Sequence, residues 1–263
     1  MTLALLALFA ALAILGCCVA GCSPKTASEV PATPKRFVVV LLDLSGSTLP
    51  YRAEYVADFE RIASSLEYGD QLAVLSVDQN SVQNSALLID YTMPSFVKDD
   101  KRQKSDYMVE QARKKWEREN PRESFREGIV ATATPAILNT QTSGSDLVGA
   151  LEVAGRMFSA KPESKKSLVI FSDMVLRGTA GKTEIDLGKP KADFAKAYDA
   201  LKANGMIPGL KDVKVTVVGA VTNDSTRWHQ IRDFWAKVFA DAGATMPLER
   251  YNRNLTNDQA KDL

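Results

Sequence analysis

The feature that most constrains the fold is an unbroken apolar run, Phe37-Val38-Val39-Val40-Leu41-Leu42, followed directly by Asp43-Leu44-Ser45-Gly46-Ser47. Such a run is typical of a strand buried on both faces in the middle of a parallel sheet. In extended backbone, side chains two residues apart point the same way, so Asp43, Ser45 and Ser47 share one face. The sequence therefore predicts a carboxylate and two hydroxyls at the carboxyl end of a buried strand, where open α/β sheets bind ligands.

These three side chains offer only oxygen donors, which suit Mg²⁺ or Mn²⁺ rather than zinc. Asp, Ser and Gly are also common in turns and at helix starts. A turn that caps the following helix is therefore the alternative interpretation. Further oxygen ligands elsewhere in the chain would favour the metal site.

Composition adds two limits. The 263 residues are 45% hydrophobic and 25% charged, which is ordinary for a globular protein. The net charge of +1 implies no bulk attraction to nucleic acid or to an acidic membrane surface. The sequence also contains no P-loop, no G-x-G-x-x-G and no basic-aromatic pattern typical of nucleic-acid binding.

The first 22 residues contain no charged side chain and are mostly Ala, Leu and small residues, as in a signal sequence. Their end, Val19-Ala20-Gly21-Cys22, resembles the lipobox of bacterial lipoproteins, although no Lys or Arg precedes it. The resemblance implies cleavage before Cys22 and lipid attachment there. The residue after the cysteine is Ser23 and not Asp, which resembles the sorting pattern of outer-membrane lipoproteins. We therefore expect a protein that is anchored in the outer membrane and faces the periplasm. A weaker match ends at Cys17, and an uncleaved membrane anchor is the alternative.

All three cysteines, Cys17, Cys18 and Cys22, lie in this stretch, so a chain cleaved before Cys22 has no disulfide and no cysteine metal site. Residues 23–35 contain three prolines and are expected to form a tether. The globular domain is expected over residues 36–251. A C-terminal tail is expected over residues 252–263.

The remainder of the chain alternates between strand and helix patterns. The expected strands are 36–42, 71–77, 85–91, 167–172, 213–218 and an edge strand at 246–251. The expected helices are 51–68, 146–158, 191–204 and 227–242. Only residues 78–84 join the second and third strands, too few for a crossover helix, so these strands should be antiparallel. The order predicts an α/β fold: a doubly wound, mostly parallel, Rossmann-like sheet with one antiparallel strand, helices on both faces and strand order 3-2-1-4-5-6.

Residues 98–127 are dense in both charges, with ten Lys or Arg and eight Asp or Glu. We expect a solvated helical region with ion pairs, divided at Pro121. A partner-binding surface is the alternative. Residues 178–190 are expected to form a polar loop.

The predicted strand order provides a test of the metal site. If strands one and four are neighbours, further oxygen ligands should follow strand four and precede the helix before it. Strand four ends in Ser172-Asp173, and the loop before that helix reads Thr142-Ser143-Gly144-Ser145-Asp146-Leu147. Both places carry the expected oxygens, so the metal interpretation is favoured over a simple turn.

Together, D-x-S-x-S after a buried strand, G-S-D-L at the start of a helix and S-D after a later strand resemble the metal-ion-dependent adhesion site of von Willebrand factor type A (VWA) domains. The resemblance covers roughly residues 36–251. It implies that Ser45 and Ser47 ligate the ion directly and that Asp43 holds coordinated water. It also implies that Ser145 ligates in place of the usual threonine and that Asp173 contacts the ion through water.

Two points leave this assignment open. Thr142 and Ser143 are alternative hydroxyls to Ser145, whereas Asp146 is expected in the first turn of the helix. Met174 stands where the family often has glycine, which predicts a loop of different shape.

Two carboxylates and three hydroxyls leave a six-coordinate cation dependent on water and open to one further ligand. The resemblance implies that an Asp or Glu carboxylate of a protein partner takes that position. We expect a metal-dependent binding module on a lipid tether, and no enzyme. The alternatives are a metal-assisted hydrolase and a structural VWA-like module without a metal-dependent ligand. His229, the only histidine, is expected to be a surface or packing residue.

Overall fold

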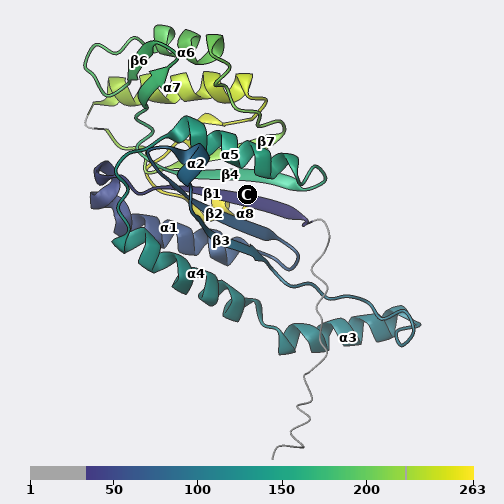
Figure 1. The fold of residues 1–263 in the computed structure, drawn as a ribbon. Helices are drawn as coiled ribbons and strands as arrows, with labels where there is room; N and C mark the ends of the chain where they lie inside the picture. The colour runs from purple at the N-terminus through teal and green to yellow at the C-terminus, as the bar shows by residue number, and fades with distance from the viewer. Residues whose placement is uncertain (1–33, 223) are drawn as a thin grey trace, which may run out of the picture.

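Five strands form the central sheet of the protein, in the order β3-β2-β1-β4-β7 (Figure 1). The structure is a computed structural model that describes residues 34–222 and 224–263. The strands are β1 (Arg36–Asp43), β2 (Gln71–Val77), β3 (Leu87–Thr92), β4 (Lys165–Phe171) and β7 (Val213–Val218). Within this five-stranded sheet, only β3 is antiparallel to its neighbour. The doubly wound, mostly parallel α/β fold with one antiparallel strand is confirmed.

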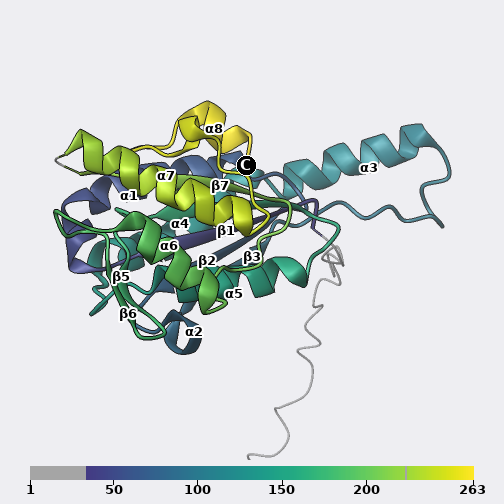
Figure 2. The ribbon, with the colours of Figure 1, turned by 90° about the horizontal axis from the view of Figure 1, so that it is seen from above.

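Helices cover both faces of the sheet (Figures 1 and 2). One face carries α1 (Arg52–Ser65), α4 (Arg122–Asn139) and α8 (Asn257–Lys261). The other carries α5 (Leu147–Ser159), α6 (Phe194–Ala203) and α7 (Ser225–Asp241). The short elements are α2 (Ser81–Asn84) and the 3₁₀ helices η1 (Gly46–Tyr51) and η2 (Leu248–Arg250). Two separate hydrophobic cores therefore lie above and below the sheet.

The two cores explain the apolar run of β1. Phe37, Val39 and Leu41 point into the core beneath α5 and α7, whereas alternate residues such as Val40 point toward α1. Each of these side chains is buried. Fully burying one such side chain contributes about 1.5–3 kcal/mol, so a polar residue is excluded from either face.

Residues 178–190 were expected to be a polar loop, and this prediction is wrong for their first half. Strands β5 (Arg177–Ala180) and β6 (Thr183–Asp186) form a two-stranded hairpin. Gly181 forms the turn with a φ of +58°, a conformation that glycine adopts without steric cost. Ala180 and Ile185 join the core, and the hairpin packs against α6 (Figure 2).

The prediction of an edge strand at 246–251 is also wrong. Pro247 has no N–H to donate to a ladder, and the chain instead forms η2 there. Single bridges, Lys214 to Thr245 and Val217 to Tyr251, hold this segment beside β7.

Residues 252–263, expected to be a tail, belong to the packed domain. Leu255, Ala260 and Leu263 are buried in the core on the α1 face. The carbonyl of Leu263 accepts a hydrogen bond of 3.1 Å from Arg36 at the start of β1. The tail interpretation failed because so short a segment has too few apolar positions to reveal a periodicity.

Helix α3 (Asp106–Glu119) extends away from the body as an arm, here defined as residues 98–120 (Figures 1 and 2). None of its helical residues is buried. Ion pairs three and four residues apart lie along it, such as Arg113 to Glu110 at 2.7 Å and to Glu117 at 3.2 Å. The expectation of a charged helical region with ion pairs is confirmed. Within the described residues, no helix combines the length and the apolar character needed to cross a membrane.

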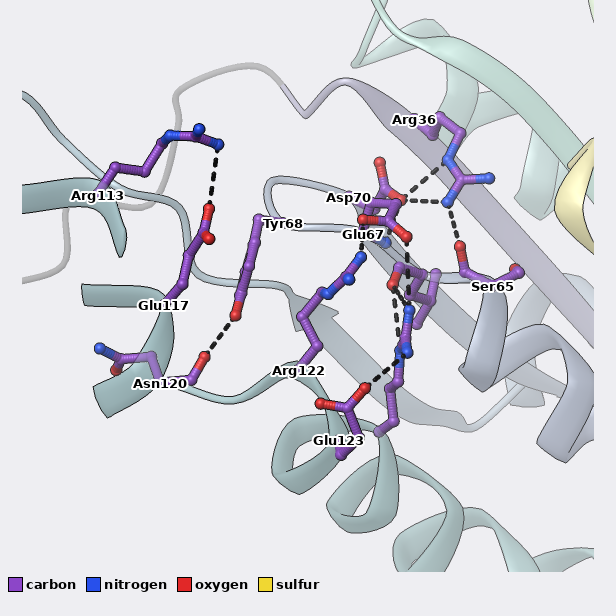
Figure 3. A network of polar contacts seen from close by, with 12 residues as sticks. Arg36, Ser65, Glu67, Tyr68, Asp70, Arg113, Glu117, Asn120, Arg122 and Glu123 are labelled. Carbon is purple, nitrogen blue, oxygen red and sulfur yellow. Dashed lines mark hydrogen bonds and ion pairs between the residues drawn. The ribbon is translucent and has the colours of Figure 1, made fainter. Parts of the chain in front are cut away.

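The base of the arm is held by polar contacts (Figure 3) and by an aromatic contact. The Trp116 ring meets Tyr68 edge-on, with centroids 5.0 Å apart. The Tyr68 hydroxyl donates a hydrogen bond of 2.6 Å to the Asn120 carbonyl, and the Arg122 guanidinium lies 5.5 Å from the Tyr68 ring. Arg122 also pairs with Glu67. The arm is thus attached at one end.

Trp116→Ala is expected to release the arm without unfolding the domain. Loss of the ring contact removes the main apolar attachment, while both cores remain intact. Limited trypsin digestion should cut faster at Lys114 and Lys115, with little change in Tm. Tyr107→Ala serves as the control, because that side chain is 74% exposed at the far end of α3. A large fall in Tm for Trp116→Ala would contradict local release.

Candidate metal centre

Asp43 lies at the centre of the candidate site. It is the last residue of β1 and only 1% exposed. Its Oδ1 accepts a hydrogen bond of 3.0 Å from the Ser45 N–H. Its Oδ2 accepts hydrogen bonds from the hydroxyls of Ser145 and Ser172, at 2.9 and 2.8 Å. One carboxylate therefore joins the loop after β1, the loop before α5 and the end of β4.

Ser45 and Ser47 lie on the same side of the loop, as the spacing predicted. Their Oγ atoms are 3.1 Å apart. Thr48 fixes the turn from beneath, since its buried hydroxyl donates to the carbonyls of Asp43 and Ser45 at 2.8 and 2.9 Å. The loop therefore presents two hydroxyls beside Asp43.

Of the neighbouring polar residues before α5, Ser145 is the one whose hydroxyl reaches Asp43. The Thr142 hydroxyl donates to the Gly144 carbonyl at 3.1 Å, and the Ser143 hydroxyl to Gln79 Oε1 at 3.2 Å. Asp146 is the N-cap of α5, and its carboxylate accepts from the Gly149 N–H at 2.8 Å. These contacts favour Ser145 over its neighbours as the hydroxyl of the site.

Asp173 follows β4 and faces the same loops. Its Oδ1 accepts a hydrogen bond of 3.0 Å from the Val175 N–H. Burial raises the pKa of Asp173, and the negative charge of Asp43 raises it further, against the hydrogen bond from Ser47. The carboxylates of Asp43 and Asp173 are thus shielded from solvent and repel each other across the site. A bound cation would reduce this repulsion.

Met174, the departure from the family pattern, adopts a φ of 61° in the left-handed region. For a side chain of this size that conformation is strained. The side chain is buried, and the carbonyl accepts a hydrogen bond of 2.8 Å from the Trp235 Nε1–H of α7. Tertiary contacts therefore hold Met174 in a left-handed conformation, which glycine would adopt without such support.

All five predicted site residues line one cavity of about 680 Å³ at the carboxyl edge of the sheet. They are Asp43, Ser45, Ser47, Ser145 and Asp173. The predicted lipidation site, Cys22, lies outside the described residues.

The donor set fits a hard divalent cation. It contains hydroxyl and carboxylate oxygens and neither imidazole nor thiolate, the donors that zinc prefers. No group of three or more His, Cys, Asp or Glu placed to hold a metal occurs among the described residues. A cation here would therefore depend on hydroxyls and water as well as carboxylates. Mg²⁺ and Mn²⁺ meet that description.

Three residues that support the site were missed by the sequence interpretation. Ser172 was noted as part of the S-D motif after strand four but was given no role in the site. Arg52 is 3% exposed and donates to three backbone carbonyls, those of Ser45, Ile137 and Thr140. Arg177 belongs to the unexpected hairpin and lines the cavity. A buried arginine in an amphipathic helix carries no local sequence pattern that would have identified it.

His229 is exposed on α7 beside Trp228, with ring centroids 5.0 Å apart, and does not line the cavity. The surface or packing position predicted for it is confirmed.

The raised pKa of Asp173 predicts a pH dependence for protein treated with EDTA. The carboxyl of an unfolded chain ionises near pH 4, whereas in the folded protein it keeps its proton to higher pH. Its contribution to stability is complete below the unfolded pKa and is lost as the pH rises through the folded pKa. Asp173→Asn cannot ionise, so its stability advantage over wild type should grow between pH 4 and 8. Urea unfolding midpoints measure this, and a constant difference would contradict it.

No protein family and no curated protein matches this sequence. Solved structures with a similar fold include the pilus adhesin SpaC from Lactobacillus rhamnosus GG, with 11% identity and a TM-score of 0.48 over 88% of this chain and 29% of that chain. A von Willebrand factor type A protein from Catenulispora acidiphila has 16% identity and a TM-score of 0.41 over 87% of this chain and 41% of that chain.

BatB from Bacteroides thetaiotaomicron has 13% identity and a TM-score of 0.38 over 86% of this chain and 94% of that chain. The present chain thus spans less than half the length of the first two proteins. These likenesses concern the fold alone. The strand order, the single antiparallel strand and the helices on both faces define a doubly wound, mostly parallel α/β domain.

Proposed function

We propose that this chain is a divalent-metal-dependent protein-binding module of the bacterial envelope. In this proposal, Mg²⁺ or Mn²⁺ at the β1 loop binds an Asp or Glu carboxylate of a protein partner. One observation carries the proposal: hydroxyls and carboxylates from three separate segments converge on one cavity around Asp43.

The residues of the proposed site have two different roles toward the ion. Ser45, Ser47 and Ser145 offer neutral oxygens, and Asp43 and Asp173 act through coordinated water. Since neither carboxylate would touch the ion directly, the protein would neutralise little of its charge. A bound ion supplies one exchangeable position for the carboxylate of the partner.

Anchoring belongs to the same proposal. Lipid on Cys22 and a tether over residues 23–35 would hold the domain at the outer membrane, facing the periplasm. Strand β1 has eight residues and spans about 26 Å. It runs from Arg36, which directly follows the proposed tether in the sequence, to Asp43, so the site lies at the opposite end of β1 from Arg36.

Affinity capture from envelope extract tests the proposal. Immobilised wild type is expected to retain a partner in millimolar Mg²⁺ and release it in EDTA, whereas Asp43→Asn should retain none. Retention of the same proteins in EDTA would overturn metal dependence. Turnover of a phosphoester or ester probe in Mg²⁺, without a retained partner, would favour metal-assisted hydrolysis instead.

A further inference from the structure

The cavity at the candidate metal centre is larger than an ion requires, and its second half is apolar. Beyond the oxygen-bearing loops it extends to the β5–β6 hairpin and the region of α5 and α6. The apolar lining consists of Val148, Val175, Leu176, Ile185, Leu201 and Met206; Val175 and Met206 are half-buried, and the other four are buried core residues that form its floor. One cavity therefore joins a cluster of carboxylates and hydroxyls to a surface suited to an aliphatic or aromatic side chain.

Arg177 is the one positively charged residue among the described residues that line this cavity. Its side chain is 64% exposed, and its Nε lies 3.4 Å from Oδ1 of Asp186. This contact is an ion pair across the hairpin, and it leaves the guanidinium more than half exposed. The donors that do not face Asp186 can bind a ligand carboxylate, which arginine holds through two parallel hydrogen bonds.

We infer that this pocket selects a partner segment with two acidic groups and a bulky apolar side chain. One carboxylate takes the metal position, the apolar side chain packs against Val175 and Met206, and the second carboxylate pairs with Arg177. This inference rests on the proposed function. Arg177 also gives specificity by repulsion, because a partner lysine or arginine at the same place would meet a like charge.

A random heptapeptide display library, selected on the full chain in non-ionic detergent with Mg²⁺, tests the inference. Wild type should enrich peptides that carry two acidic residues near an aliphatic or aromatic one. Arg177→Gln should still enrich Mg²⁺-dependent peptides with one acid and the apolar residue, but without preference for the second acid. Lys182→Gln is the matched control, because it removes a charge from the turn of the same hairpin, outside the cavity.

Affinities of one selected peptide and its amide variant complete the test. Replacing the second acid by its amide should weaken binding to wild type about 5–10-fold, as expected for a charged hydrogen-bonded pair. The same replacement should leave binding to Arg177→Gln unchanged. Equal losses for both proteins, with Mg²⁺ dependence intact, would overturn the role of Arg177 and leave the proposed function standing. If no peptide were enriched, or if enrichment were equal in EDTA, the proposed function would fail, and this inference with it.

Discussion

Asp43→Asn is expected to abolish the stabilisation of the protein by Mg²⁺. At a free concentration one hundred times the dissociation constant, an ion that binds only the folded state adds about 2.7 kcal/mol. For a domain of this size that raises Tm by roughly 5–10 °C. Asparagine keeps the acceptor for the Ser45 N–H, and its amide group can donate to the two serine hydroxyls that now donate to Oδ2. The fold should therefore survive while the charge is lost.

Melting curves in EDTA and in millimolar Mg²⁺ measure this effect. In EDTA the variant should melt at or above the temperature of wild type, because Asp173 no longer faces a second negative charge. Ser145→Ala and Ser143→Ala form a matched pair of hydroxyl deletions. Of these two serines, only Ser145 contacts Asp43. Only its loss should therefore reduce the rise in Tm caused by Mg²⁺. Identical wild-type curves in both conditions would rule out metal binding.

Arg52→Met is expected to lower the free energy of unfolding by about 3–5 kcal/mol. The guanidinium donates to the carbonyls of Ile137 and Thr140 at 2.6 and 2.8 Å, and to that of Ser45 at 3.3 Å. Burial lowers the pKa of Arg52. Three carbonyls and the Thr48 hydroxyl, rather than an acidic partner, accept its hydrogen bonds. Removal of the guanidinium would leave buried carbonyls without donors. It would also free the loop after β1 from the end of α4.

Urea unfolding in EDTA gives the stability change, and Mg²⁺ titration of the variant gives the second readout. Arg52→Lys should recover only part of the loss, because a single ammonium cannot span carbonyls on two segments. Arg156→Met is the control, because Arg156 is exposed on α5; its effect should stay within about 0.5 kcal/mol. If Arg52→Met lowered the free energy of unfolding no more than Arg156→Met, the hydrogen bonds of Arg52 would contribute little to stability.

Much of the site follows from local patterns in the sequence. The apolar run before Asp43 requires a strand buried on both faces. The strand ends at Asp43, and the turn into the 3₁₀ helix η1 places Ser45 and Ser47 beside one another. The short 78–84 connection requires an antiparallel neighbour. The order of strands and helices then brings Ser145 and Asp173 to the same edge of the sheet. Each step depends on residues close together in the chain or on connection lengths.

Other features were decided by tertiary structure alone. Arg52 reaches carbonyls 85 and 88 residues away, and no local period marks such a contact. The β5–β6 hairpin is too short for a clear alternation, yet it adds Arg177 and an apolar wall to the cavity. Met174 keeps a left-handed conformation because buried contacts support it. The sequence by itself determined the sheet and the set of oxygen atoms at its edge, because periodicity and chain connectivity are local. Packing between distant segments decided how those atoms are held and what lies beside them.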